Sequence, residues 1–132
     1  MEESKMNESK FYRCERCGNI VGLIENGGGQ LVCCGQKMTK LEAGVVEASR
    51  EKHIPVAEVS QGAVKVTVGS VLHPMSEEHS IEWIYLETNK GGQRRGLKPG
   101  EAPEAVFALA DGEVAVAAYA WCNLHGLWKV EL

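Results

Sequence analysis

The sequence predicts a mainly β protein in which a small metal-stapled module precedes an antiparallel β-sandwich. Four of the five cysteines lie between residues 14 and 34, where glycines are frequent and apolar residues are few. After residue 44, short β-rich runs alternate with turn residues, and no segment has a sustained helical period. The 132 residues suffice for such a module and a second domain of roughly 90 residues.

The predicted module spans residues 11–42 and follows a polar, mixed-charge tail, residues 1–10, that we expect to be disordered. The tail contains no apolar segment of the kind that a secretory signal needs. Apolar pieces of the module, such as residues 19–24, are too short to form a core that folds unaided. We therefore expect a metal ion bound by the cysteines to stabilise this module.

The predicted sandwich spans residues 43–132. Val64, Val66 and Val68 alternate with Lys65 and Thr67, which is the period of two shown by a strand with one buried face. Similar β-rich runs occur at residues 54–59, 81–87, 105–109, 114–121 and 127–130. Turn residues separate them, including the glycine-containing stretch 89–92. Runs at this spacing predict about seven strands in an immunoglobulin-like arrangement.

Charge and hydropathy restrict the possible partners. The formal net charge is −4, so no basic field is available to hold nucleic acid or an anionic membrane. The longest apolar run, residues 114–122, is about half the length that a membrane helix needs. We therefore expect a cytoplasmic protein with neither nucleic acid nor membrane as a partner.

The cysteine cluster offers four thiolates, the number that a tetrahedral iron or zinc site requires: Cys14, Cys17, Cys33 and Cys34. The two-residue spacing of the first pair lets both sulfurs reach one ion. The second pair is adjacent, so it cannot form the usual zinc-ribbon knuckle and should distort the tetrahedron. In a reducing compartment, crowded cysteines favour metal ligation over disulfides. A structural zinc site and a disulfide framework remain as alternatives to iron.

A second set of donors lies entirely in the predicted sandwich and contains every histidine of the chain together with the fifth cysteine: His53, His73, His79, His125 and Cys122. A single histidine is more often a surface or hydrogen-bonded residue than a ligand. Four of them with a free cysteine in a tight turn indicate a metal site instead. Five nitrogen and sulfur donors exceed the four that zinc prefers, and imidazole with thiolate suits iron. A sixth position would then be open to a substrate.

Local sequence predicts where these donors lie. A proline follows His73 and favours an extended backbone there, so we expect His73 and His79 on one loop. Cys122 and His125 are three residues apart on a turn after a hydrophobic strand, where both can reach the same ion. His53 is predicted at the start of another strand.

Several motifs resemble those of the superoxide reductases: Glu51-Lys-His-Ile-Pro55, His73-Pro-Met-Ser-Glu-Glu-His79, Ile81-Glu-Trp-Ile84 and Cys122-Asn-Leu-His-Gly-Leu-Trp128. The segment from Cys14 to Cys34 resembles the desulforedoxin module that precedes this domain in desulfoferrodoxins. The resemblance runs from about Phe11 to the C-terminus, and the motifs agree in order and spacing. One departure is Ser80, where many relatives carry an aromatic residue.

The resemblance implies two irons in each chain. One would be held by the four cysteines of a desulforedoxin-like module. The other would have the four histidines in a plane and Cys122 in the axial position. In the family, the residue matching Glu51 can occupy the sixth position of the oxidised iron, and the residue matching Lys52 guides superoxide.

The implied activity is that of a superoxide reductase, which reduces superoxide to hydrogen peroxide by one electron at ferrous iron. The implied electron donor is a rubredoxin-like protein or another reductase, and the four-cysteine iron would relay electrons. Family members are commonly homodimers.

Two other functions remain open from the residues. The chain could be a two-iron electron-transfer protein without a substrate, which a sealed second site would support. It could also be a zinc-stabilised sandwich that binds a protein partner through Trp83, Trp121 and Trp128. The apolar strand runs around Trp83 and Trp121 favour a core location for these side chains.

Overall fold

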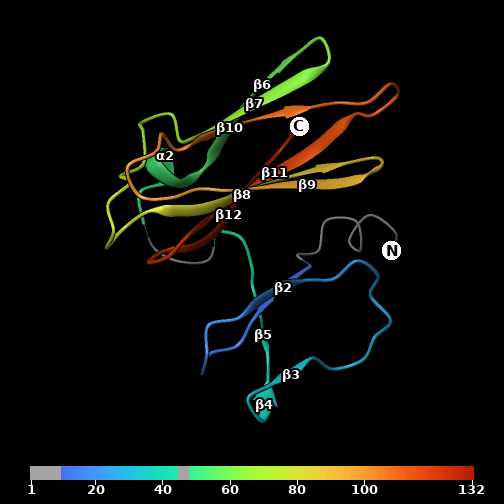
Figure 1. The fold of residues 1–132 in the computed structure, drawn as a ribbon, viewed down its shortest axis with the longest axis vertical. Helices are drawn as coiled ribbons and strands as arrows, with labels where there is room; N and C mark the ends of the chain where they lie inside the picture. The colour runs from blue at the N-terminus through green and yellow to red at the C-terminus, as the bar shows by residue number, and fades with distance from the viewer. Residues whose placement is uncertain (1–9, 45–47) are drawn as a thin grey trace. The chain divides into compact units, whose positions relative to one another are not determined.

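The structure is a computed structural model that describes residues 10–44 and 48–132, so the predicted disordered tail lies almost entirely outside the described residues. The chain divides into two compact units between Ala43 and Gly44, and strands predominate in both (Figure 1). The mainly β fold predicted from the sequence is confirmed. Among the described residues, no helix has the length and apolar character needed to cross a membrane.

The first unit contains a three-stranded sheet in the order β2–β1–β5 and a two-stranded hairpin, β3–β4. These strands are β1 (Phe11–Arg13), β2 (Ile20–Gly22), β3 (Val32–Cys33), β4 (Gln36–Lys37) and β5 (Thr39–Lys40). The buried apolar side chains of its described part are Phe11, Cys14 and Met38. A core of this size stabilises a fold weakly, so a bound metal would contribute much of the stability of this unit.

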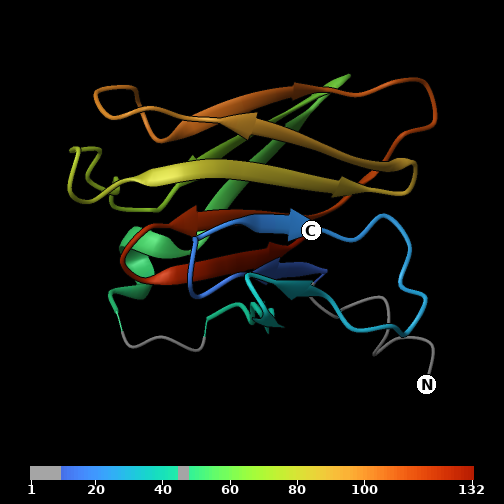
Figure 2. The same ribbon diagram turned by 60° about the horizontal axis from the view of Figure 1, so that its bottom comes forward.

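The second unit is a sandwich of two antiparallel sheets, in the orders β10–β7–β6 and β12–β11–β8–β9 (Figure 2). Within residues 44 and 48–132, seven strands are present: β6 (Pro55–Ser60), β7 (Ala63–Val68), β8 (Ile81–Thr88), β9 (Gly91–Gly96), β10 (Glu104–Ala108), β11 (Ala115–Cys122) and β12 (Gly126–Glu131). The expected number of strands and the expected antiparallel arrangement are both present. A short helix, α2 (Arg50–His53), precedes β6.

The core lies between the two sheets. Val64, Val66 and Val68 of β7 are fully buried, as their alternation with polar residues predicts. They belong to one cluster with residues of the opposite sheet, namely Ile81, Ile84, Leu86, Ala118, Ala120 and Cys122. Cys122 is therefore anchored in the core while it ends strand β11.

Strand β9 begins within the turn predicted at residues 89–92 and continues through residues 93–96, where no strand was predicted. Its sequence, Gly-Gly-Gln-Arg-Arg-Gly, has no apolar residue and therefore no detectable period of two. It pairs with β8 along the edge of the sheet, with Glu87 opposite Gly92. A side chain at Gly92 would collide with the ring of Tyr85, so this glycine leaves room for the tyrosine beside the strand.

The tryptophans differ in burial: Trp121 and Trp128 are buried, as expected, whereas Trp83 is only partly buried. Trp83 and Trp121 face each other across β8 and β11 and stack with ring centroids 6.4 Å apart. Their neighbours Ile84 and Ala120 point into the inter-sheet core, so by strand alternation the tryptophans lie on the outer face of this sheet. The expectation that Trp83 packs inside the core was wrong, because its place in an apolar run did not reveal which face it would join.

Candidate metal centres

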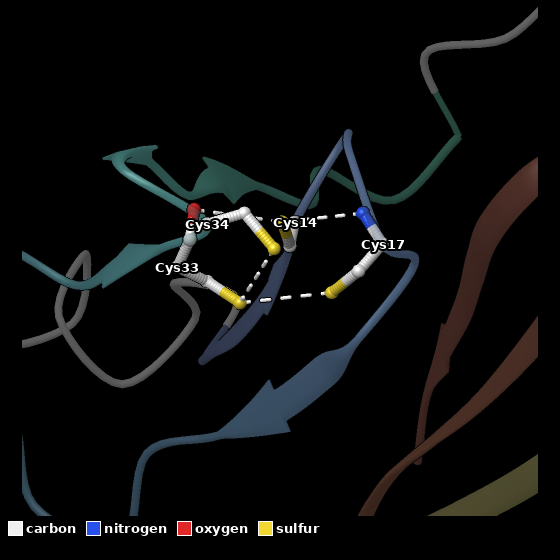
Figure 3. Close-up of side chains that lie close together, drawn as sticks. All are labelled: Cys14, Cys17, Cys33 and Cys34. Atoms are coloured by element: carbon white, nitrogen blue, oxygen red, sulfur yellow. Dashed lines mark hydrogen bonds between the residues drawn. The ribbon is translucent and has the colours of Figure 1, made fainter.

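The four cysteines of the first unit lie together as a cluster whose sulfur atoms are all within 4.8 Å of one another. Figure 3 shows their sulfurs turned toward a common point, with Cys17 Sγ 3.6 Å from Cys33 Sγ. Cys14 follows β1, and Cys33 ends β3. All five cysteines of the chain are free, so the disulfide framework considered from the sequence is wrong.

A left-handed backbone at Cys34 explains how two adjacent residues serve one cluster. Successive side chains of a strand point to opposite faces. Cys34 leaves the strand with φ 54°, and Gly35 follows with φ 77°, which closes the β3–β4 turn. The turn brings Cys34 Sγ to 4.0 Å from Cys33 Sγ. A left-handed conformation is uncommon for a residue other than glycine and often accompanies a functional constraint.

The thiols of this cluster cannot all ionise without a cation. A hydrogen bond from the backbone N–H of Cys17 lowers the pKa of Cys14 to about 6. The pKa of Cys34 is raised to about 12, mainly by its hydrogen bond with Cys17 and next by that with Cys14. One thiolate therefore forms at the expense of its neighbours, whereas a bound metal cation would permit all four to ionise. Four convergent sulfurs fit an iron ion in a tetrahedral site.

The second group of donors begins with His53, which the structure places differently from the prediction. His53 is the last residue of α2, a single turn in which Ile54 N–H donates to Arg50 O, and strand β6 starts only at Pro55. Four residues are too few to show a helical period, so the sequence concealed this turn. The backbone at Ile54 is extended because a proline follows it.

The other donors lie on the predicted loop and turn. His73 and His79 lie in the loop between β7 and β8, as the sequence predicts. Cys122 ends β11, and His125 lies in the three-residue turn that leads into β12. Gly126 takes a φ of 84°, which lets the hairpin close with Cys122 opposite Gly126.

The four imidazoles form a square in the order His53, His73, His79, His125. Neighbouring ring centroids are 4.6, 4.6, 5.0 and 4.9 Å apart, and the diagonal from His53 to His79 is longer, at 6.2 Å. Neighbouring rings stand nearly perpendicular, with interplanar angles from 79° to 86°. Cys122 Sγ approaches this square at 3.9 Å from His125 Nδ1. The arrangement brings together all five donors predicted from the sequence.

Backbone carbonyls orient two of the rings. His53 Nδ1 lies 2.6 Å from Ser49 O, and His73 Nδ1 lies 2.6 Å from Pro74 O. A carbonyl can only accept a hydrogen bond, so both rings carry their proton on Nδ1 and a lone pair on Nε2. A second hydrogen bond of this kind commonly orients a metal-ligating histidine.

The nitrogen atoms that face one another need a cation between them. His53 Nε2 and His73 Nε2 lie 3.2 Å apart, and neither holds a proton to share. His53 Nε2 is also 3.1 Å from His125 Nδ1. In the described part of the chain, His79 Nε2 is buried and has no hydrogen-bond partner. Two nitrogens bound at right angles to one metal ion, each about 2.1 Å away, would lie roughly 3.0 Å apart.

The electrostatics of the cluster favour neutral imidazoles. Burial lowers the pKa of His73 to about 4, and burial is also the main cause that lowers the pKa of His53 and His79. Burial raises the pKa of Cys122, while hydrogen bonds from the backbone of Leu124 and His125 oppose that rise. Neutral nitrogens with a thiol that a cation would ionise are a donor set for iron.

The two residues before His53 differ from the ligands in exposure. Glu51 and Lys52 are consecutive residues of α2, and both are exposed. The positive charge of Lys52 contributes to lowering the pKa of His53 and of His79, after burial and the other histidines. Its positive charge therefore acts in the same direction as burial on these two imidazoles.

Comparison with known proteins gives matches over both units. The sequence profile of desulfoferrodoxin matches residues 45–131, and that of the desulfoferrodoxin N-terminal domain matches residues 6–41. The desulfoferrodoxin of Nitratidesulfovibrio vulgaris is 48% identical over 125 residues, which cover 95% of this chain and 98% of the relative. The desulforedoxin of Megalodesulfovibrio gigas is 56% identical over 34 residues, 26% of this chain and 92% of that protein.

Comparison with solved structures gives matches to superoxide reductases. The superoxide reductase from Treponema pallidum superposes with a TM-score of 0.80 at 40% identity, covering 95% of this chain and all of that one. A superoxide reductase from Giardia intestinalis, described as a one-iron protein, superposes with a TM-score of 0.51 at 34% identity. It covers 62% of this chain and 99% of its own.

Proposed function

Since the chain belongs to the desulfoferrodoxin family, we propose that it is a superoxide reductase. The proposed reaction adds one electron and two protons to superoxide and yields hydrogen peroxide. The two donor clusters correspond to the two irons of this family, one with four cysteines and one with four histidines and a cysteine. The solved structures that resemble the chain include superoxide reductases.

The observation that carries the proposal is the square of four imidazoles with a single sulfur beside it. Bound in this cluster, iron would supply the electron by passing from the ferrous to the ferric state. Cys122 would donate electron density through its sulfur, as thiolate ligands do in haem proteins. His79 and His125 are only partly buried, so the cluster is not sealed from solvent as that of a pure electron carrier would be.

We assign capture of the anion to Lys52 and a role at the open position to Glu51. The ammonium group of Lys52 would attract superoxide to the cluster, since the protein as a whole has a net charge of −4. Glu51 lies one residue further from His53 and is exposed, so its carboxylate is free to approach an open metal position. Both assignments rest on the position of these residues in α2.

The first unit would relay electrons to the second. We propose that the four-cysteine iron accepts electrons from an external donor, a rubredoxin-like protein or another reductase, and that the protein works as a homodimer. Free cysteines in both clusters suit a reducing compartment, which supports a cytoplasmic location.

Metal analysis with visible spectra of the oxidised and reduced protein tests the proposal, together with the rate of superoxide reduction. We expect two irons in each chain with separate absorption bands. Cys122→Ser should abolish superoxide reduction while the bands of the four-cysteine iron survive, because the two clusters share no residue. Zinc in place of iron, or full activity in Cys122→Ser with its iron intact, would contradict the proposal.

A further inference from the structure

We propose that Asn123 is a positioning residue for the iron of the second unit. Its side chain ties the segment that carries His79 to the turn that carries Cys122 and His125. The inference rests on the iron site of the proposed function, and it does not depend on which reaction that iron performs.

Asn123 makes three hydrogen bonds to the residues on either side of His79. Its Oδ1 accepts from the backbone N–H of Ser80 at 3.0 Å, and its Nδ2 donates to Glu78 O at 3.0 Å. Its own backbone N–H donates to Ser80 O at 3.2 Å. An N–H must meet an oxygen and a carbonyl must meet an NH₂ group, so the orientation of the amide is determined. The bonds link segments more than 40 residues apart in the sequence.

The His79 ring depends on this support more than the rings of His53 and His73 do. Carbonyl groups orient the rings of His53 and His73 through Nδ1. No hydrogen bond to the His79 ring is present within residues 10–44 and 48–132, and its Nε2 is buried and unpartnered. The backbone around His79 must therefore determine where its ring lies.

Two side chains determine the path of that backbone. Ser76 Oγ accepts from the N–H of His79 at 3.2 Å, which shapes the loop from within. Asn123 supplies the bonds that relate this loop to the Cys122–His125 turn. Since Cys122 and His125 are donors of the same cluster, the amide of Asn123 sets the position of one donor relative to two others.

Asn89 provides a matched control at the opposite end of β8. Its Oδ1 accepts from Val114 N–H at 2.7 Å and its Nδ2 donates to Gly112 O at 3.0 Å, which is the same pair of bonds to another loop. Both asparagines are exposed. Asn123→Ala and Asn89→Ala thus remove equivalent bonds, and only the first acts on the metal cluster.

The test compares the two variants in the iron-loaded protein by thermal unfolding, by the visible and electron paramagnetic resonance spectra of the second iron, and by titration with a chelator. We expect both to lower Tm to a similar extent. Only Asn123→Ala should alter the spectra of the second iron and weaken its retention, by about 10- to 100-fold. Spectra and iron retention equal to those of Asn89→Ala would overturn the inference.

If Asn123→Ala does not fold, Asn123→Asp provides a second test of the inference. Aspartate retains the acceptor for Ser80 N–H but places a carboxylate oxygen in place of the NH₂ group that donates to Glu78 O, so iron retention should fall below that of the wild type. Retention equal to the wild type would overturn the inference. A wild-type protein that holds the second iron and does not reduce superoxide would refute the proposed function, while the comparison for Asn123 would still be valid.

Discussion

At the scale of single residues, the charge of Lys52 bears on how an acidic protein captures an anion. The net charge of −4 repels superoxide at long range, and Lys52 lies one residue from a donor of the cluster. Lys52→Glu should slow the bimolecular reaction with superoxide about tenfold and flatten or reverse its dependence on ionic strength. Pulse radiolysis at several salt concentrations measures both effects.

The control for this prediction is Lys90→Glu. It changes the net charge by the same amount, from −4 to −6. Strand β8 begins at Ile81, two residues after the donor His79, and ends at Thr88, two residues before Lys90. The strand is about 23 Å long at roughly 3.3 Å per residue. Such a distance exceeds the Debye length of about 8 Å at physiological salt. If the rate of reaction with superoxide and its salt dependence are equal in the two variants, Lys52 does not guide superoxide to the cluster.

At the scale of elements, the position of α2 depends on its contact with the loop after β7. A side-chain carbon at Gly69 would lie 2.5 Å from Glu51 O and 3.0 Å from Ile54 O. Val71 N–H also donates to Glu51 O at 3.0 Å. Gly69→Ala should therefore displace the turn that carries His53, cost about 1–3 kcal/mol of stability, and shift the spectrum of the second iron.

Gly96→Ala is the matched control for this substitution. A side-chain carbon there would meet only the flexible end of Arg94, at 3.4 Å. Chemical denaturation and visible spectra of the two variants would distinguish a local effect on α2 from a general intolerance of alanine. An unchanged iron spectrum in Gly69→Ala would show that α2 is not held by this contact.

The turn between β10 and β11 gives a prediction that depends on pH. A hydrogen bond from Ala110 N–H, together with one from Thr88 Oγ1, lowers the pKa of Glu113 from its ordinary value of 4.5. The folded protein therefore favours the ionised carboxylate, so this stabilisation is present above pH 4.5 and is lost as the pH falls below it.

Glu113→Gln should lower Tm at neutral pH, and its difference from the wild type should shrink below pH 4.5, where the wild type also loses the carboxylate. Glu58→Gln removes a charge from an exposed position of β6 and controls for net charge. A difference in Tm that is independent of pH would show that the carboxylate of Glu113 does not stabilise the turn through its charge.

At the scale of the whole molecule, the two units have separate cores and separate metal clusters. Cys34→Ser should remove the spectrum of the first iron and loosen the first unit, while the second iron and much of the superoxide reductase activity remain. Limited proteolysis should then cut within residues 11–41 first. Complete loss of activity with an intact second iron would show that the first iron is required for electron delivery.

The sequence by itself determined the chemistry of both clusters and most of the strands. Ligand chemistry resides in residue type and short spacing, so Cys14-x-x-Cys17 and Cys122-x-x-His125 could be recognised without a structure. Strand β7 could be recognised because its valines repeat with a period of two. Strand β9 and helix α2 could not, because the first has no apolar residue and the second is a single turn.

Only the tertiary structure decided the order of the imidazoles around the cluster and the contacts that hold them. His53, His79 and His125 come from three segments that meet only in the folded sandwich, so no local pattern encodes their arrangement. For the same reason, the sequence did not reveal the roles of Gly69 and Asn123. Each looks like an ordinary turn residue in the sequence, and its role arises from a backbone segment at least 15 residues away that folding brings against it.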